Sequence, residues 1–280
     1  MLWKTIPRTI TNKQFRRLTG VKRSTFEKMC FIIKEVKAQR RKHPKRGKEP
    51  KLCIEDQLLM MLMYYREYRT FLHIGTDYGV SESQCWRIVR DVEDILIQSK
   101  AFCLPGKKAL TKSDVNWSVV LVDVGESPIE RPKKKQRRYY SGKKKKHTHK
   151  MQLVVGKDGK IICLRTDKGR KHDFRVFKES NVHVHPEIKI QTDSGYQGIK
   201  KYHHNSEVPY KHSKKKKLTT EQKKYNHKVS SSRVQVEHII RKQKIFKIIA
   251  ERYRNRRKRF GLRVNLIAGI YNYDLYNNFN

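Results

Sequence analysis

Residues 117–150 read WSVVLVDVGESPIERPKKKQRRYYSGKKKKHTHK, and this stretch decides the fold. Its apolar, β-branched start is typical of a buried strand, and the strand ends at a single acid, Asp123. The chain then becomes a dense block of lysine and arginine, which we expect to form a basic arm or hairpin from Arg131 to Lys150. The two features together place an acid beside a surface that attracts a polyanion.

The residues that follow predict an α/β domain. Strand patterns occupy residues 150–166 and 187–193, and helical patterns occupy residues 173–180, 229–255 and 259–273. Within the first of these strand patterns, Lys157, Asp158 and Gly159 predict a hairpin turn. Because strands are followed by helices, we expect one α/β domain that begins near Val115.

The N-terminal part is predicted to be helical. Apolar residues recur at helical spacing between Asn12 and Lys37, which predicts two short helices, the second with Ser24 as its N-cap. Residues 39–50 combine charge, proline and glycine without a period, so we expect a loop or linker there.

Residues 54–98 predict three further helices, and the sequence GVSES separates the last two. Gly79 follows a helix end and Ser81 caps the next helix. One face of the last helix is expected to be apolar and is formed by Trp86, Val89, Val92 and Leu96. This arrangement suits a helix-turn-helix, although a three-helix bundle that binds nothing has the same spacing. The charge of the chain favours the DNA-binding interpretation.

The charge also selects the class of partner. Lys and Arg number 67 against 26 Asp and Glu, and the formal net charge of +41 is spread along the chain, which favours a polyanion. No apolar run approaches the roughly 18 residues that a spanning helix needs, and the N-terminus lacks the apolar segment of a signal peptide. The 5 cysteines lie singly, which favours free thiols in a reducing compartment. We therefore expect a soluble, cytoplasmic protein.

Three acids are distinguished by their placement. Asp123 and Asp193 each close a strand, and Glu237 lies in a helix among apolar and basic residues. Strand ends in an α/β sheet open into one crevice, a following helix can add a third carboxylate, and three carboxylates would hold Mg²⁺. The pattern alone leaves alternatives open, because each Asp could form a turn and Glu237 could pair with Arg233 or Arg241. Competing acids are Glu126, Glu130, Asp167 and Asp173.

Five segments, in this order, resemble bacterial insertion-sequence transposases of the IS5 type, which have a DDE catalytic core. They read DVGESPIERPKKKQRRYYSGKKKKHTHK, KGRKHDFRVFKES, TDSGYQG, SSSRVQVEHIIRKQKIFK and YRNRRKRFGLRVNLIAGIYN. The resemblance covers the chain from about residue 115 to its end, and the N-terminal part is similar to the helix-turn-helix that often precedes such a core. Arg233, Glu237 and Lys244 keep the family's spacing, whereas Ser230 and Gly125 stand where Tyr and Thr are usual.

The resemblance implies a ribonuclease-H-like α/β core, with a central mixed sheet flanked by helices, over residues 110–280. A helical segment and basic linker at residues 1–49 and an all-α helix-turn-helix domain at residues 50–105 would precede it. Asp123, Asp193 and Glu237 match the family's catalytic residues and would bind two Mg²⁺ ions, for which Mn²⁺ could substitute. The implied activity is cleavage at the terminal inverted repeats of the element, followed by attack of the freed 3′-hydroxyl on target DNA.

The basic residues would bind double-stranded DNA, both the transposon ends and the target. The expected contacts are Arg233, Lys244, Arg137, Arg138, Lys143 and Lys144 for phosphates, with Ser83, Gln84 and Arg87 on the recognition helix. Tyr139, Tyr140 and Tyr196 lie among cations and could stack on exposed bases near a nicked end, or pack in the core. The family implies a homodimer or higher oligomer associated with the bacterial nucleoid.

Two other functions remain open at this stage. One is a catalytically silent, domesticated DNA-binding protein that keeps the fold and the charge. The other is a metal-dependent DNA nuclease without strand transfer, which would use the same three carboxylates.

Overall fold

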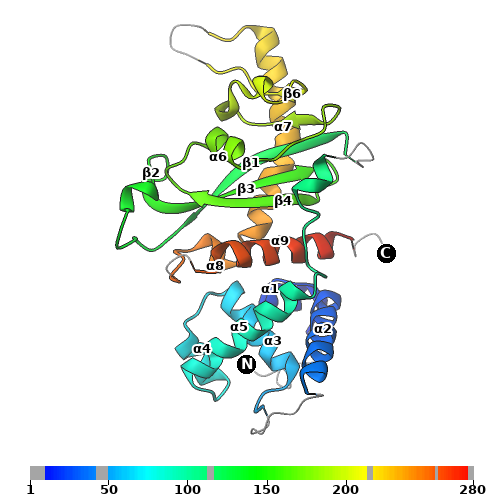
Figure 1. The fold of residues 1–280 in the computed structure, drawn as a ribbon, viewed down its shortest axis with the longest axis vertical. Helices are drawn as coiled ribbons and strands as arrows, with labels where there is room; N and C mark the ends of the chain where they lie inside the picture. The colour runs from blue at the N-terminus through cyan, green and yellow to red at the C-terminus, as the bar shows by residue number, and fades with distance from the viewer. Residues whose placement is uncertain (1–9, 42–49, 112–116, 213–216, 256–257, 277–280) are drawn as a thin grey trace. The chain divides into compact units, whose positions relative to one another are not determined.

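The computed structural model describes residues 10–41, 50–111, 117–212, 217–255 and 258–276. The chain forms two compact units, whose elements are labelled in Figure 1. The α/β unit consists of residues 104–243 and 252–261, and the helical unit consists of residues 1–103, 244–251 and 262–280.

The α/β unit is built on a mixed sheet. Its strands are β1 (Val119–Pro128), β2 (Tyr140–Ser141), β3 (Lys146–Gly156), β4 (Ile161–Lys168), β5 (Lys189–Gln191) and β6 (Ser206–Glu207). β1 pairs antiparallel with β3, which pairs antiparallel with β4. On its other side β1 runs parallel to β5, and β5 runs parallel to β6. The strands and the hairpin turn at Lys157–Gly159 that the sequence predicted are therefore confirmed, with Gly159 at a φ of 85°.

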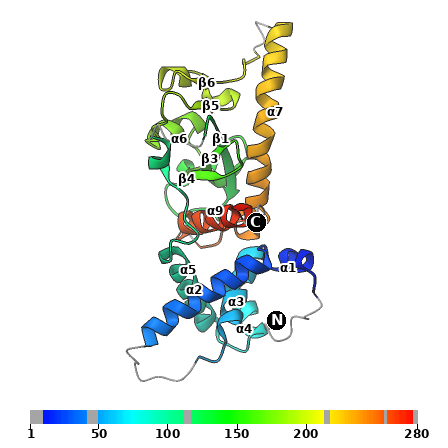
Figure 2. The same ribbon diagram turned by 90° about the vertical axis from the view of Figure 1, so that its right-hand side faces the viewer.

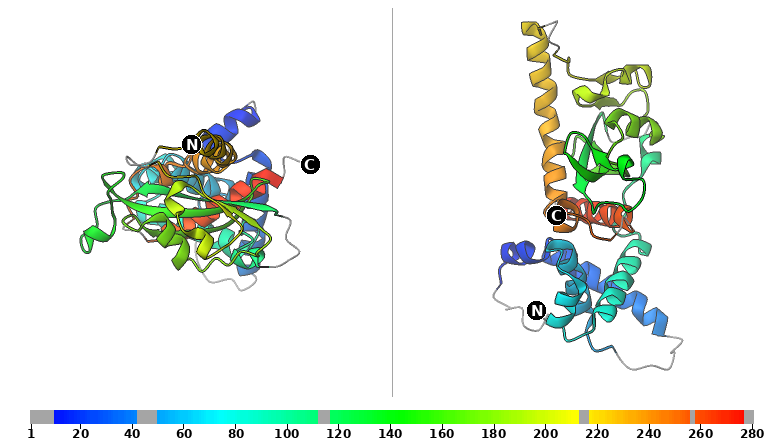
Figure 3. Two further views of the ribbon diagram at one scale, coloured as in Figure 1. Left: turned by 90° about the horizontal axis from the view of Figure 1, so that it is seen from above. Right: turned by 90° about the vertical axis from the view of Figure 1, so that its left-hand side faces the viewer.

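Helices cover both faces of this sheet. α6 (Asp173–Glu179) and α7 (Thr220–Gln243) lie on opposite faces in Figure 2, and the right panel of Figure 3 shows α7 running alongside the sheet. Val120 and Val122 of β1 pack in a buried core with Phe177 of α6. Because successive residues of a strand point to opposite faces, Asp123 and Gly125 face α7. The predicted α/β class, with a mixed sheet flanked by helices, is confirmed.

The basic arm, residues 131–150, forms the predicted hairpin. The 3₁₀ helix η3 (Gln136–Arg138) leads into β2, which pairs with the start of β3 so that Tyr140 lies opposite His147. The backbone N–H of Thr148 donates to the carbonyl oxygen of Tyr139 at 2.8 Å, which holds the arm to β3. Three other 3₁₀ helices lie in this unit: η2 (Lys107–Leu110), η4 (Ser194–Tyr196) and η5 (Ile199–Lys201).

The helical unit contains both N-terminal and C-terminal helices. They are α1 (Asn12–Thr19), α2 (Arg23–Arg41), α3 (Ile54–Arg66), α4 (Phe71–Asp77), α5 (Glu82–Gln98), α8 (Lys247–Ala250) and most of α9 (Phe260–Tyr276). The predicted turn between α4 and α5 is confirmed, because Gly79 has a φ of 63° and the Ser81 hydroxyl accepts from the Gln84 N–H at 3.2 Å.

Two local expectations are wrong. α2 begins at Arg23 and runs to Arg41, so Ser24 lies inside its first turn and is not the N-cap. Trp86 is 43% exposed, and the guanidinium carbon of Arg90 lies 4.6 Å from the centroid of its ring. The buried face of α5 instead passes through Cys85, Val89, Val92 and Leu96, and Trp86 lies one position off this face.

α9 packs within the helical unit although it lies near the end of the sequence. Arg263 Nε donates to Glu93 Oε1 of α5 at 2.7 Å, and Lys22 Nζ donates to the backbone oxygen of Asp274 at 2.7 Å. A Cβ atom on Gly269 would lie 1.8 Å from the carbonyl oxygen of Phe102, so only glycine permits this approach. Contacts thus group α9 with the N-terminal helices, and the domain boundaries expected from the sequence stay a prediction.

None of the helices in the described ranges combines the length and apolar character that a membrane crossing requires.

Candidate active site

Asp123 and Asp193 lie at the same level of two neighbouring parallel strands. The prediction that Asp123 closes its strand is wrong, because β1 continues to Pro128 and Asp123 lies opposite Leu153 of β3. The pairing of β1 with β5 ends at Leu121 and Gln191, and Asp123 and Asp193 follow these partners by the same interval. Asp193 then caps η4, because its Oδ1 accepts from the backbone N–H of Gly195 at 3.0 Å. The parallel register therefore places Asp123 and Asp193 on neighbouring segments, just past the point where β1 and β5 stop pairing.

Glu237 is supplied by α7, which is tied to the sheet by two hydrogen bonds. Ser232 Oγ donates to Gln191 Oε1 at 2.8 Å, and Gln235 Nε2 donates to the carbonyl oxygen of Lys157 at 2.9 Å. Val236, next to Glu237, is fully buried, whereas Glu237 itself is exposed. The hydrogen bonds set the rotation of α7 and leave the Glu237 carboxylate at the surface of the site.

The three acids are coupled electrostatically. Asp123 is only 17% exposed, and burial raises the pKa of its carboxyl above the ordinary value. The charge of Arg233 and a hydrogen bond from the Val124 N–H lower this pKa, whereas the like charges of Asp193 and Glu237 raise it. The charges of Asp193 and Glu237 therefore act on Asp123, and we refer to the three acids as the charge cluster; their role as catalytic residues stays a prediction.

Arg233 is directed at this cluster. Its Nη2 lies 3.6 Å from Asp123 Oδ1 and its side chain is 14% exposed. Its Nε is buried and has no hydrogen-bond partner among the described residues. Arg233 therefore pairs with Asp123 rather than with Glu237, which answers the alternative that the sequence left open.

Tyr196 packs in the core of the α/β unit with Val122 and Phe177, which confirms one of the two expectations for it. Its side chain is fully buried, and its hydroxyl has no hydrogen-bond partner in the described part of the chain. Burial raises the pKa of Tyr196 well above its ordinary value, and the charges of Asp173, Asp193 and Asp123 raise it further. Stacking of Tyr196 on a base is excluded by its burial.

The competing acids are occupied elsewhere. Lys150 Nζ lies 2.6 Å from Asp173 Oδ1 and 4.0 Å from Glu126 Oε1, and Lys171 Nζ lies 2.7 Å from Asp167 Oδ2. Glu130 is exposed, two residues after the end of β1. Asp173 and Glu126 have a buried ammonium group as partner, whereas the Asp123 cluster has three carboxylates for one arginine.

The donors of this cluster suit a hard divalent cation in charge and in chemistry, since carboxylate oxygens are the ligands that Mg²⁺ prefers. Among the described residues, no three His, Cys, Asp or Glu side chains are arranged as a metal cage. The residues therefore fit a divalent cation in the type of their donor atoms and in their negative charge, of which the nearby Arg233 compensates only a part.

The family is decided by a match over the part of the chain that carries this cluster. Residues 122–272, which include Asp123, Asp193 and Glu237, match the family described as DDE superfamily endonuclease. The chain belongs to the DDE superfamily of endonucleases. Residues 50–101 of the endonuclease match the family described as the helix-turn-helix of DDE superfamily endonuclease. The predicted helix-turn-helix is therefore confirmed, and it corresponds to α3, α4 and α5.

A curated relative extends this similarity to nearly the whole endonuclease. The "Probable transposase for insertion sequence element IS702" of Microchaete diplosiphon is 52% identical over 267 residues, which cover 95% of this chain and 96% of that protein. No solved structure matches the chain significantly. The identity to the relative spans both compact units.

Gly125 of the endonuclease has a packing role that the sequence did not reveal. A Cβ atom at this position would lie 3.3 Å from Cγ2 of Ile240 and 3.4 Å from Cε of Met151. Ile240 is on α7, one turn from Glu237, so the absence of a side chain at Gly125 lets this helix lie close to β1. The glycine at this position therefore fits the approach of Ile240 to β1.

Replacing Gly125 by Thr is expected to lower the free energy of unfolding of the endonuclease by about 1–3 kcal/mol, because the added atoms overpack against Ile240. Gly125→Ala should cost less, since a lone Cβ needs a shift of only a few tenths of an ångström. Urea denaturation followed by circular dichroism measures both. The double variant Gly125→Thr with Ile240→Ala is the control, and failure of the second substitution to recover stability would remove the packing explanation.

The predicted DNA-contacting residues of the arm are at the surface. The exposed ones are Arg137, Arg138, Lys143 and Lys144. On α5, Ser83 and Arg87 are exposed and Gln84 is half-buried near the N-terminus of the helix. Lys244 directly follows the last residue of α7, so it does not share a helix face with Arg233 and Glu237 as the spacing suggested. Their roles in DNA binding stay predictions.

Proposed function

We propose that the endonuclease is a transposase that binds the terminal inverted repeats of its insertion sequence and catalyses metal-dependent DNA strand cleavage and strand transfer. The observation that carries this proposal is the 52% identity to a probable insertion-element transposase over 95% of the chain. The charge cluster of Asp123, Asp193 and Glu237 supports it, because this cluster lies inside the region that matches the endonuclease family.

Asp123, Asp193 and Glu237 would hold divalent cations, with Mg²⁺ as the expected ion and Mn²⁺ as a substitute. Two bound ions supply activation of the attacking oxygen and stabilisation of the leaving oxygen. Asp193 is kept in place by the Gly195 N–H, and Arg233 offers a guanidinium beside Asp123 to a phosphate of the scissile strand. No nucleophilic side chain is required, since water and then the 3′-hydroxyl attack phosphorus.

The two units would divide the recognition of DNA. The arm, Arg233 and Lys244 bind phosphates of the transposon end and of the target without regard to sequence. The start of α5, with Ser83, Gln84 and Arg87, reads bases of the inverted repeat in the major groove. A homodimer or higher oligomer on DNA and membership of the IS5 type complete the proposal.

The test is a cleavage and joining assay on a supercoiled donor that carries the ends of the element. We expect strand cleavage and joined products with Mg²⁺ or Mn²⁺, and neither product when EDTA removes the metal. Binding to the same ends, measured by gel shift, should persist in EDTA because the helix-turn-helix and the arm carry it. Binding with neither cleavage nor joining in Mg²⁺ would favour a silent DNA-binding protein, and cleavage without joining would favour a nuclease.

A further inference from the structure

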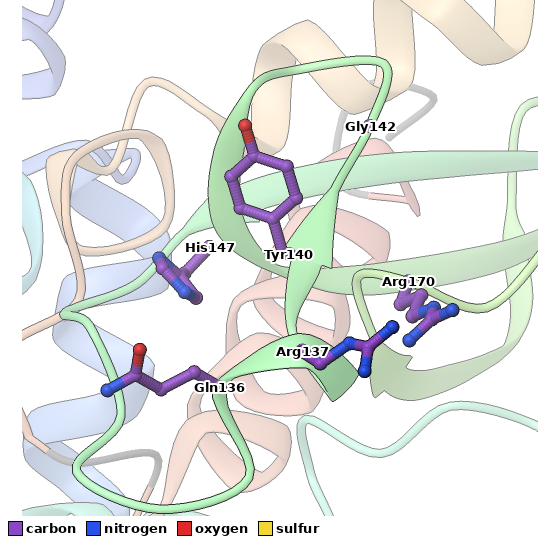
Figure 4. Close-up of a pocket in the computed structure, with 6 residues that line it drawn as sticks. All are labelled: Gln136, Arg137, Tyr140, Gly142, His147 and Arg170. Atoms are coloured by element: carbon purple, nitrogen blue, oxygen red, sulfur yellow. The ribbon is translucent and has the colours of Figure 1, made fainter.

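A pocket on the basic arm lies outside the charge cluster of the carboxylates. It is a hollow of about 550 Å³ lined by Gln136, Arg137, Tyr140, Gly142, His147 and Arg170. Figure 4 shows the rings of Tyr140 and His147 on one side of it and the side chains of Arg137 and Arg170 on the other. No Asp or Glu is among the described residues that line it. The pocket therefore combines aromatic surface with uncompensated positive charge.

Tyr140 is the aromatic residue of the arm that is available to a ligand. Its side chain is 43% exposed, whereas Tyr139 is buried and packs edge-on against His149 at 5.6 Å. The cross-strand pairing of β2 with β3 places His147 directly opposite Tyr140, with ring centroids 5.6 Å apart and planes 72° apart. The two rings are therefore packed edge to face, and the 43% exposure of Tyr140 leaves part of its ring open to a ligand.

Arg170 is brought to this pocket by a close approach of two backbones. The N–H of Gly169 donates to the carbonyl oxygen of Thr148 at 3.0 Å, and the N–H of Arg170 donates to that of Arg138 at 3.3 Å. A Cβ atom on Gly169 would lie 2.1 Å from Thr148 Oγ1, so glycine is required for the loop to reach the arm. The second cation of the pocket is therefore built in by the fold.

We propose that this pocket binds one unpaired nucleotide of the DNA substrate, with the base stacked on Tyr140 and its phosphate held by Arg137 and Arg170. The volume suits one nucleotide, since pockets for small ligands measure about 300–1,000 Å³. A paired base is covered by its neighbours in the duplex and cannot lie on a ring inside a pocket. The aromatic face accepts any base, and the arginines match a phosphate, so binding depends on exposure of the base rather than on its identity. This proposal rests on the proposed function only in taking DNA as the substrate.

The test measures stacking and affinity without cleavage. A duplex with a short single-stranded overhang carries 2-aminopurine in the overhang, and a blunt duplex of the same sequence is the comparison, both in EDTA. We expect the full-length protein to quench 2-aminopurine and to bind the overhang duplex more tightly than the blunt one. Tyr140→Ala should abolish the quenching and weaken binding of the overhang duplex by about 5- to 150-fold, with the blunt duplex unchanged. Tyr140→Trp should retain both.

Two kinds of control separate the pocket from general charge. Tyr202 is 62% exposed and is flanked by Lys200 and Lys201, so Tyr202→Ala is a matched variant outside the pocket and should change nothing. Arg137→Ala and Arg170→Ala should weaken binding of the overhang duplex more than that of the blunt duplex and lower the salt dependence of overhang binding by about one phosphate contact each, whereas equal losses on both duplexes would contradict the phosphate assignment. Deoxyadenosine monophosphate added at the DNA concentration should not displace the overhang duplex.

Each outcome bears on the pocket separately from the cleavage chemistry. Absence of quenching by the wild type, equal quenching by Tyr140→Ala, or displacement by the free mononucleotide would overturn the assignment to DNA, even in a preparation that cleaves and joins ends. Tyr140-dependent quenching in a preparation that does not cleave would support the pocket and contradict the proposed transposase activity.

Discussion

Replacing Asp193 by Asn is expected to lower the rate of strand cleavage by at least about 10²- to 10³-fold, while affinity for the transposon end stays within about twofold of the wild type. Asn keeps the size of the side chain and an oxygen that can accept from the Gly195 N–H, so the geometry of η4 is preserved. The substitution removes a negative charge from the cluster. The loss would not come from protonation of Asp123, because removal of a like charge lowers the pKa of Asp123.

Single-turnover cleavage on a labelled end measures this loss, and gel shift on the same end measures binding. Glu187→Gln is the matched control, since Glu187 has 85% of its side chain exposed near the start of β5 and the change also converts a carboxylate to an amide. Cleavage by Asp193→Asn at the wild-type rate would remove Asp193 from the site. Asp173, whose charge also acts on Tyr196, would then be the next acid to replace.

Replacing Arg263 by Ala is expected to lower the free energy of unfolding of the helical unit by about 3–5 kcal/mol. Arg263 Nε donates to Glu93 Oε1 at 2.7 Å, and the two side chains are 4% and 0% exposed. Removal of the arginine would take this charged hydrogen bond from the buried Glu93 carboxylate, to which Tyr65 would still donate at 3.1 Å. A buried ion that has lost its partner is costly because neither water nor a cation replaces the interaction.

Urea unfolding followed by circular dichroism measures this change. The exposed pair of Lys247 and Glu67 is the control, because both side chains are about 40% exposed and Lys247→Ala should leave the unfolding midpoint nearly unchanged. The double variant Arg263→Met with Glu93→Leu should recover a large part of the loss, since it removes both charges. A loss below 1 kcal/mol for Arg263→Ala would show that the Glu93 site is accessible to water.

The sequence predicted the parts of the molecule that local patterns determine. The run before Asp123, the turn at Lys157–Gly159 and the cap at Ser81 depend on residues close together in the chain, and each was confirmed. The choice of Asp123, Asp193 and Glu237 came from a resemblance, whereas the expectation that Asp123 ends its strand was wrong because the pairing of β1 with β3 continues to Pro128.

Other features depend on distant residues and carried no local signal. Trp86 has nearly the spacing from Val89 and Val92 that a buried residue of the same helix face would have. The structure shows that the buried face of α5 includes Cys85 instead, so Trp86 lies outside the core. Gly125 could be explained only once Ile240 was seen against it, and the burial of Tyr196 depends on the packing of α6 and η4. The period of α9 predicted a helix without indicating which partner helix it packs against.

The position of α9 has a consequence for synthesis of the protein. Glu93 is translated long before Arg263, and Phe102 long before Gly269. During synthesis, Glu93 and Phe102 therefore lack these contacts until α9 has been made. The helix-turn-helix therefore reaches its full stability only after residue 276 has left the ribosome. A message with an early stop or frameshift would yield a helix-turn-helix that lacks the hydrogen bond from Arg263 to Glu93 and the packing of Gly269 on Phe102.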